Sequence, residues 1–325
     1  MKKIFVYMAS AALMLAVSCN KEEVNVDTTA PVETELITVD LNLMTKTALG
    51  AEGATTWDAD DEVSVTVGGE SVGTLKLVEG STFSGEIVAG LSGEAVLNYP
   101  AGVADVPTIQ TAVAGSFADG AALLEGTTTV EDLRAGTGVE LQNKTALLQF
   151  TVAQAGDVTF EVGEAKYTVT GCKTGSTYYA CVTPVENASF VARIDGYLSK
   201  QASKKVTFTA NKIANLQELP APVKASWGIR GSFAGGSWNT EKYMYIDIYN
   251  SQVLKNVDFG SGAEFKFYNA SNGWSGYNEG NNAGNGWMWI SGGSGSNISA
   301  SGKVDIYVND SGWAFKIVPA GTSPF

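Results

Sequence analysis

The side chains whose types and spacing suggest chemistry lie mostly between residues 266 and 289, where tryptophan, tyrosine and asparagine alternate with glycine. Indole and phenol rings have flat apolar faces, and amide and ammonium groups beside them exchange hydrogen bonds. A sugar ring matches both, because one of its faces is made of C–H groups and its rim of hydroxyls. The sequence therefore indicates a carbohydrate-binding surface. The candidate residues are Trp238, Lys266, Trp274, Tyr277, Asn278, Asn281, Trp287 and Trp289.

Two of these tryptophans are the most specific candidates. If residues 287–290 form a strand, Trp287 and Trp289 share one face about 6.8 Å apart, near the spacing of successive sugars in a chain. Met288 and Ile290 then face the opposite side.

A domain of this size also needs large core residues, and tryptophan can supply them. Trp227, in an apolar run, and Trp313, after a turn, are predicted to be core residues. For Trp238 and Trp274, a role in the fold and a role in binding stay equally open.

Histidine is absent from the chain. This removes the commonest general base, the serine and cysteine triads that use it, and most catalytic zinc sites. Paired carboxylates could still hydrolyse a glycoside, but no local pattern singles out such a pair. We therefore predict that the protein is not an enzyme and uses no cofactor.

An acid-rich segment loosely resembles an oxygen-rich calcium loop. It contains Asp58, Asp60, Asp61 and Glu62, but the central glycine and the distal glutamate of such loops are missing. The prediction is a solvated turn with Trp57 over the edge of the core, and no metal site. The net charge of −13 and the lack of a basic patch also disfavour nucleic acid as a partner.

Short runs of valine, isoleucine, threonine and tyrosine alternate with turn residues, as at 62–67, 158–162 and 304–308. Period-two alternation with frequent turns is typical of sandwiches and barrels. No convincing helix is predicted after residue 19. The predicted fold class is all-β, with two consecutive β-sandwich regions. Paired prolines stiffen a linker and cannot sit inside a sheet, so the boundary is placed at residues 220–222.

Cys172 and Cys181 lie in apparent strands on either side of a short turn. A cross-strand disulfide is one possible state in an oxidising compartment, and two free buried thiols are the other.

The N-terminus begins with Lys2 and Lys3, followed by an apolar run that is too short to span a bilayer. Residues 15–19 (LAVSC) resemble the lipobox of bacterial lipoproteins, whose cysteine is joined to diacylglycerol and acylated, for example with palmitate. The resemblance implies a signal peptide over 1–18 and a lipidated Cys19 that starts a flexible tether over 19–35. An ordinary signal peptide with an incidental cysteine is the alternative.

Lys21, Glu22 and Glu23 follow Cys19 almost directly. They resemble the export signal that sends Bacteroidota lipoproteins to the outside of the outer membrane. The resemblance implies a lipid-anchored outer-membrane protein that faces the cell exterior.

The segments 45–49 (TKTAL) and 57–65 (WDADDEVSV) resemble the opening of fimbrillin-like lipoproteins. Further segments fit that family in the same order, at 99–101, 144–150, 178–182 and 206–216. The resemblance covers about residues 36–219 and implies β-sandwich subdomains of the transthyretin-like kind.

The remaining residues resemble the glycan-binding β-sandwiches of SusE-type starch-utilisation lipoproteins. The frame consists of 226–233 (SWGIRGSF), 236–238 (GSW), 264–267 (EFKF), 273–274 (GW) and 302–308 (GKVDIYV). It implies a small immunoglobulin-like carbohydrate-binding sandwich over 223–325. Residues 277–286 replace the usual compact N-[YW]-G-G segment, so starch as the ligand does not follow.

Two functions are compatible with these features. In one, a surface lipoprotein captures a polysaccharide or host glycan with its last domain. In the other, the protein is a fimbria-like structural or adhesive component. Other glycan-uptake or fimbrial proteins at the surface are further candidate partners.

Overall fold

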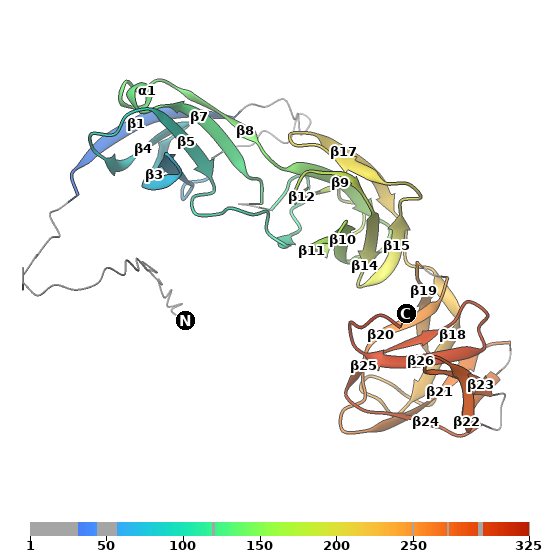
Figure 1. Ribbon diagram of the computed structural model, residues 1–325. Coiled ribbons are helices and arrows are strands. Elements are labelled where there is room, and N and C mark those ends of the chain that lie inside the picture. The colour runs from blue at the N-terminus through green and yellow to red at the C-terminus, as the bar shows by residue number, and fades with distance from the viewer. Residues whose placement is uncertain are drawn as a thin grey trace, which may run out of the picture. The chain divides into compact units, whose positions relative to one another are not determined.

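The computed structural model describes residues 32–43, 57–118, 121–248, 250–271, 273–291 and 295–324, with the backbone alone at 43 and 278–281. Within these residues the chain forms 26 strands and one short helix, so the all-β prediction is confirmed (Figure 1). Residues from Thr34 onward form one compact unit. Cys19, Lys21, Glu22 and Glu23 lie outside the described residues.

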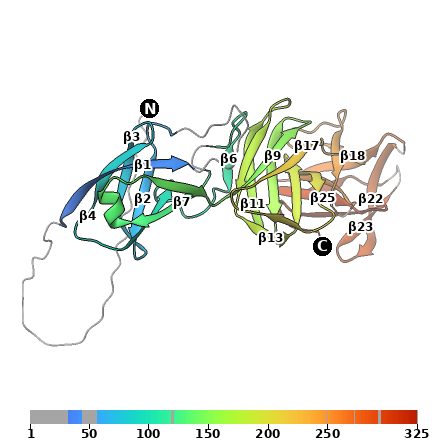
Figure 2. The same ribbon diagram turned by 90° about the horizontal axis from the view of Figure 1, so that it is seen from above.

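The first region is built of the seven strands β1 (Thr34–Leu43), β2 (Glu62–Val67), β3 (Glu70–Glu79), β4 (Thr82–Val88), β5 (Glu94–Tyr99), β7 (Leu124–Thr129) and β8 (Val139–Asn143). They close into a barrel in the order β1-β4-β3-β2-β5-β7-β8, seen from above in Figure 2. β1 makes the closure, because its first part pairs antiparallel with β4 and its last part pairs parallel with β8. Closure leaves no unpaired edge among these seven strands.

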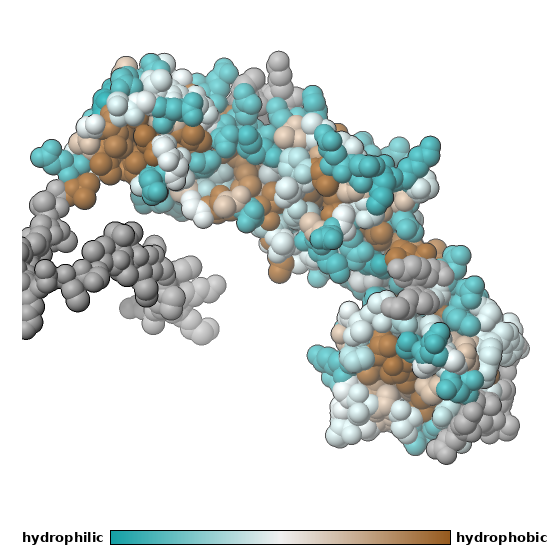
Figure 3. Space-filling model, viewed as in Figure 1, coloured by the Kyte–Doolittle hydropathy of each residue, from teal (hydrophilic) through white to brown (hydrophobic). Residues whose placement is uncertain are grey.

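Alternation along the strands separates the inside of this barrel from its surface. Val63 and Val65 of β2 are fully buried, as the period-two pattern requires. Some apolar side chains remain outside, and hydrophobic residues gather on the surface over β1 and its neighbours in Figure 3. Exposed examples on these strands are Leu36 in β1 and Val78 in β3.

The acid-rich turn before β2 is structural. Trp57 packs edge-on against Phe83 and Tyr99, with ring centroids 4.8 and 5.2 Å away, so its predicted place at the core edge is confirmed. Asp61 is buried and accepts hydrogen bonds from the Asp58 backbone N–H at 2.7 Å and from the Tyr99 hydroxyl at 2.8 Å. Asp61 therefore closes the turn, and to that extent the prediction of a solvated turn is wrong. Among the described residues, no cluster of three potential metal-ligating side chains forms here or elsewhere.

The helix α1 (Val130–Arg134) was not expected from the sequence. Five residues are too few to show a 3.6-residue period, so the pattern that reveals longer helices is missing. The Thr129 hydroxyl caps it by accepting a hydrogen bond from the Asp132 N–H at 3.1 Å. No helix in the described part of the chain has the length and apolar character needed to cross a membrane.

The second region contains ten strands: β6 (Ile109–Thr111), β9 (Ala146–Val152), β10 (Gly156–Val162), β11 (Ala165–Cys172), β12 (Tyr178–Val182), β13 (Val185–Ala188), β14 (Phe190–Ile194), β15 (Tyr197–Gln201), β16 (Val206–Phe208) and β17 (Ile213–Leu219). They form a five-stranded sheet, β15-β14-β10-β11-β6, a three-stranded sheet, β12-β9-β17, and the pair β13-β16. Phe150 of β9 and Phe160 of β10 belong to different sheets and meet edge to face at 5.0 Å in the core.

The two cysteines follow the free-thiol alternative. Cys172 ends β11 and Cys181 lies in β12, and both are buried and free. The expected hairpin between them does not form, because β11 and β12 belong to different sheets. A cross-strand disulfide therefore has no pair of adjacent strands on which to form.

The third region contains nine strands: β18 (Lys224–Gly231), β19 (Lys242–Ile246), β20 (Gln252–Asp258), β21 (Ala263–Asn269), β22 (Gly273–Gly284), β23 (Trp287–Ser291), β24 (Ile298–Ala300), β25 (Lys303–Val308) and β26 (Ala314–Pro319). The sheet runs in the order β18-β19-β20-β25-β26-β23-β22-β21-β24, and a further pairing of β18 with β21 closes it. Its interior is filled by Phe265, Phe267 and Phe315, which are fully buried.

The buried side chains fall into separate clusters. One extends from Ile37 to Leu219 and another from Trp227 to Phe315. The boundary at 220–222 stays a prediction, because Tyr197 from before it packs against the second cluster.

Polar and aromatic contacts cross this predicted boundary. Arg193 in β14 pairs with Glu161 at 3.1 Å and with Asp247, just after β19, at 2.8 Å. Tyr197 of β15 packs on Tyr245 of β19, with ring centroids 4.2 Å apart. Arg193 and Asp247 are both buried, so this ion pair is removed from water.

Candidate functional site

The outer face of β21 carries the polar side chains of the candidate site. Phe265 and Phe267 point into the core, and the alternating residues Lys266 and Tyr268 point outward. Residues that face each other across paired strands lie on the same face of the sheet. Arg230 of β18 is opposite Lys266, and Trp274 of β22 is opposite Tyr268. The register therefore places four side chains from three strands together.

A loop between β18 and β19 adds Trp238 to this face. Buried Phe233 anchors the loop, and its carbonyl accepts a hydrogen bond from the Gly236 N–H at 2.8 Å. The indole of Trp238 is 37% exposed and lies beside that of Trp274, with ring centroids 6.1 Å apart and planes tilted by 45°. The two rings thus form an angled surface instead of a flat one.

The loop before β24 adds Asn297. It crosses close over β22 at Gly276, where a Cβ atom would collide with the carbonyl oxygens of Gly295 and Ser296. Hydrogen bonds between the backbones of Tyr277 and Ser296 hold the crossing. The Asn297 amide N–H then donates to the Glu264 carboxylate at 2.8 Å.

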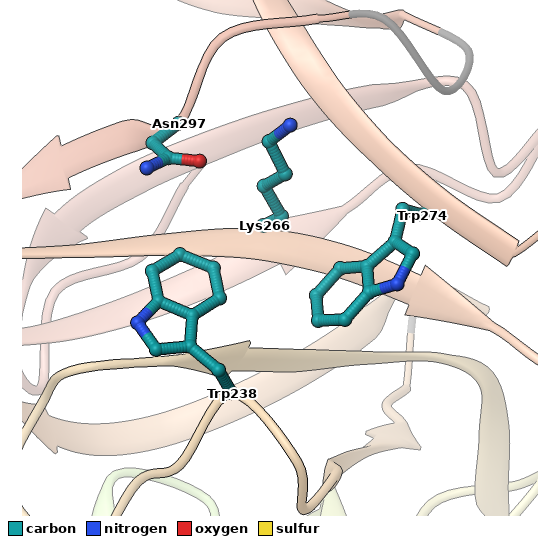
Figure 4. A pocket seen from close by; sticks show the side chains of 4 residues that line it. All are labelled: Trp238, Lys266, Trp274 and Asn297. Carbon is teal, nitrogen blue, oxygen red and sulfur yellow. The ribbon is translucent and has the colours of Figure 1, made fainter.

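An open pocket of about 410 Å³ is lined by Trp238, Lys266, Trp274 and Asn297. Figure 4 shows Trp238 and Trp274 on either side, with the Lys266 side chain between Trp274 and Asn297 in this view. The pocket thus combines two aromatic rings, one ammonium group and one amide. This set can stack on an apolar ring face and form hydrogen bonds at its rim.

A stack of side chains on the same face supports Trp274. The Arg230 guanidinium carbon lies 3.6 Å from the centroid of the Tyr268 ring and 5.4 Å from that of Trp274. Tyr268 meets Trp274 edge to face at 5.5 Å. Such cation–π and aromatic contacts fix the orientation of Trp274 before any ligand is present.

One carboxylate borders this stack. The Glu241 side chain lies against Gly228, where an added Cβ atom would collide with the carboxylate unless that side chain moved. Burial raises the pKa of Glu241, and the charges of Arg230 and Lys224 lower it by less.

The indole N–H groups distinguish structural tryptophans from pocket tryptophans. The Trp57 N–H donates to the Leu41 carbonyl at 3.2 Å, and the Trp227 N–H donates to the Gly312 carbonyl at 2.8 Å. Within the described residues, the N–H groups of Trp238 and Trp274 have no such acceptor.

The pocket brings together three of the eight predicted residues: Trp238, Lys266 and Trp274. Tyr277 is directed elsewhere, because its ring meets Phe315 of the core edge to face at 6.0 Å. The side chains of Asn278 and Asn281 lie outside the described part of the chain.

Trp287 and Trp289 occupy β23, as predicted, but they do not line the pocket. Met288 packs against the core and Ile290 is buried, so the predicted alternation is confirmed. Trp287 packs against a small cluster on the outer face, formed by Val253, Tyr307 and Val318. Trp289 is 44% exposed.

The two core predictions have opposite outcomes. Trp227 is buried in the core, as expected. Trp313 is 51% exposed, so its prediction as a core residue is wrong. The Asn309 side chain accepts hydrogen bonds from the backbone N–H groups of Trp313 and Ala314, which extends the turn through Trp313.

Sequence reasoning missed Arg230, Tyr268 and Asn297 as members of the site. The alternation of Phe265 and Phe267 with Lys266 could have identified Tyr268 as a neighbour on the outer face. Nothing local in the sequence identifies Asn297, whose position depends on the loop that crosses Gly276.

No protein family profile matches this chain, and no curated protein matches it significantly. Among solved structures, it is similar to a candidate cell adhesion protein from Bacteroides ovatus, with 14% identity and a TM-score of 0.35 over 57% of this chain and 92% of that one. A fimbrial protein from Bacteroides ovatus gives 12% identity and a TM-score of 0.31, over 62% and 53%. SusF from Bacteroides thetaiotaomicron gives 12% and 0.24, over 54% and 51%. The match covers about half the length of each of these last two chains. Because the TM-scores are this low, the function is argued from the site.

Proposed function

We propose that the protein binds a carbohydrate in the pocket formed by Trp238, Lys266, Trp274 and Asn297. The observation that carries the proposal is the pair of partly exposed indoles, 6.1 Å apart, beside an ammonium and an amide group. Each indole can cover the C–H face of a sugar ring and exclude water from both surfaces. Lys266 and Asn297 lie where they can bind the hydroxyls at the rim.

The pocket is also preorganised, which reduces the entropy lost on binding. The Tyr268 ring and the Arg230 guanidinium group both contact the Trp274 ring and hold it in place. The carbonyl of buried Phe233 holds the loop that carries Trp238. A ligand therefore meets side chains that already have their bound orientation.

The proposed place of action is the cell exterior, with the protein anchored in the outer membrane through lipid on Cys19. The sequence supports this with its short apolar N-terminal run, its lipobox-like residues 15–19 and the acidic residues that follow. Several acyl chains give durable anchoring without a membrane-spanning helix.

Affinity electrophoresis of the full chain against a panel of neutral and acidic polysaccharides tests the proposed function. For a polysaccharide that retards the protein, Trp238→Ala and Trp274→Ala should each weaken retention about thirtyfold in affinity, as expected for loss of an aromatic anchor. Trp289→Ala is the matched control, since Trp289 is similarly exposed but lies outside the pocket. Equal effects of all three substitutions, or no retardation by any glycan, would contradict the proposal.

A further inference from the structure

Arg230 of β18 and Lys266 of β21 face each other on this surface, and neither forms an ion pair with a carboxylate that the structure describes. The chain has three arginines, of which Arg134 pairs with Glu35 at 2.6 Å and Arg193 pairs with Glu161 and Asp247. Arg230 instead lies on aromatic rings, and its buried Nε has no hydrogen-bond partner in the described structure.

Lys266 is unpaired in the same way. No hydrogen bond or ion pair joins its ammonium group to a side chain that the structure describes. Lys76, Lys144 and Lys166 form ion pairs with glutamates, whereas most of the described lysines, like Lys266, form none. The Lys266 ammonium therefore enters the pocket with its three donors unused.

The polar side chains that line the pocket offer mainly donors. Lys266 can only donate, with three N–H groups, and the Asn297 amide has one acceptor oxygen beside its N–H groups. Among the acidic side chains that the structure describes, Glu264 lies two residues before Lys266 on this strand, and the Asn297 amide donates a hydrogen bond to one of its oxygens. Glu241 packs on Gly228 beside Arg230 and does not line the pocket.

A donor-rich aromatic pocket with an unpaired ammonium is complementary to a sugar that carries a carboxylate. Hydrogen bonds between an ammonium and a carboxylate are shorter and about twice as strong as those between neutral groups. We infer that the pocket selects acidic sugar residues, with the carboxylate on Lys266 and the ring against Trp238 and Trp274. This inference rests on the proposed carbohydrate binding and names its substrate class.

Binding of the full chain to polygalacturonate and to the same polymer with its carboxyl groups methyl-esterified tests the inference. The two polymers share a backbone and differ in charge. Polysialic acid forms a second arm, which separates a uronate ligand from a sialate ligand. The wild-type protein should bind at least one of the acidic polymers. Its affinity for the ester should be lower than its affinity for that acidic polymer by a factor of about ten or more. Raising the salt concentration should weaken only the binding of the acid.

Lys266→Gln should lower the affinity for that acidic polymer about tenfold, the loss expected for a hydrogen bond to a charged group. It should lower any affinity for the ester by much less, because a glutamine amide can still donate a hydrogen bond to a neutral group. Lys303→Gln is the matched control, because Lys303 is an exposed lysine of the same region outside the pocket. Equal binding of acid and ester, or an unchanged affinity in Lys266→Gln, would overturn the inference. If Trp274→Ala still weakens binding to neutral polymers in that case, the proposed carbohydrate binding stands and only the selectivity for acidic sugars fails. If no polymer binds the wild-type protein, both fail.

Discussion

At the scale of single residues, Cys172 and Cys181 show how burial controls reactivity. Burial raises the pKa of both thiols to about 12. The thiolate is the reactive form, so both cysteines are almost entirely in the unreactive thiol form at neutral pH. Their raised pKa values stabilise the fold below pH 9, the usual value for a thiol, and this stabilisation is lost as the pH rises from about 9 towards 12.

We therefore expect neither cysteine to be alkylated in the folded protein between neutral pH and about 9. Both should be modified once urea unfolds the chain, and mass spectrometry of peptides treated with iodoacetamide measures this. Fast alkylation of Cys172 or Cys181 under native conditions would show that the region around it opens, and would contradict its burial.

The sequence predicted single residues unevenly. Trp227 could be placed in the core because it lies in an apolar strand. Trp313 could not be placed, because the turn that exposes it depends on hydrogen bonds that backbone N–H groups donate to the Asn309 side chain. Trp287 and Trp289 lie in a strand, as predicted, but which outer surface they face depends on the pairing of β23 with β26. Pairing between distant strands is not encoded in a local pattern.

At the scale of elements, Gly276 positions the site although it does not line the pocket. The loop of residues 295–297 can cross β22 only because residue 276 has no side chain. The crossing places Asn297 at the pocket opposite Trp274.

The sequence predicts the strands well, and β2, β10 and β25 match or extend the runs at 62–67, 158–162 and 304–308. It does not predict this crossing, because both partners are glycine-rich and have no hydrophobic period.

Gly276→Ala should therefore displace the loop and weaken glycan retention at least as much as Asn297→Ala does. A Cβ atom at this position meets backbone carbonyl oxygens, which cannot rotate away as a flexible side chain would. Affinity electrophoresis compares the two variants, and thermal melting verifies that both remain folded. Wild-type retention in a folded Gly276→Ala protein would mean that the loop does not determine the site.

At the scale of the whole molecule, the proposed lipid anchor on Cys19 would determine where the site operates. If Cys19 carries lipid, metabolic labelling of the protein with palmitate should disappear in Cys19→Ala. Replacing Lys21, Glu22 and Glu23 with alanine should reduce surface labelling of intact cells and leave lipidation unchanged. Palmitate that persists in Cys19→Ala would remove the basis of the proposed localisation.

The ion pair between Arg193 and Asp247 has a consequence for how the molecule unfolds. Each charge is buried, and Asp247 has its ion-pair partner on the other side of the predicted boundary, whereas Arg193 also pairs with Glu161 on its own side. If the core that contains Arg193 melts, Asp247 loses its partner, and removing one partner of a buried pair costs about 3–5 kcal/mol. The two cores should therefore melt as a single calorimetric transition in the intact chain. In Arg193→Met the transition should separate into two, because the link that makes their denaturation cooperative is gone.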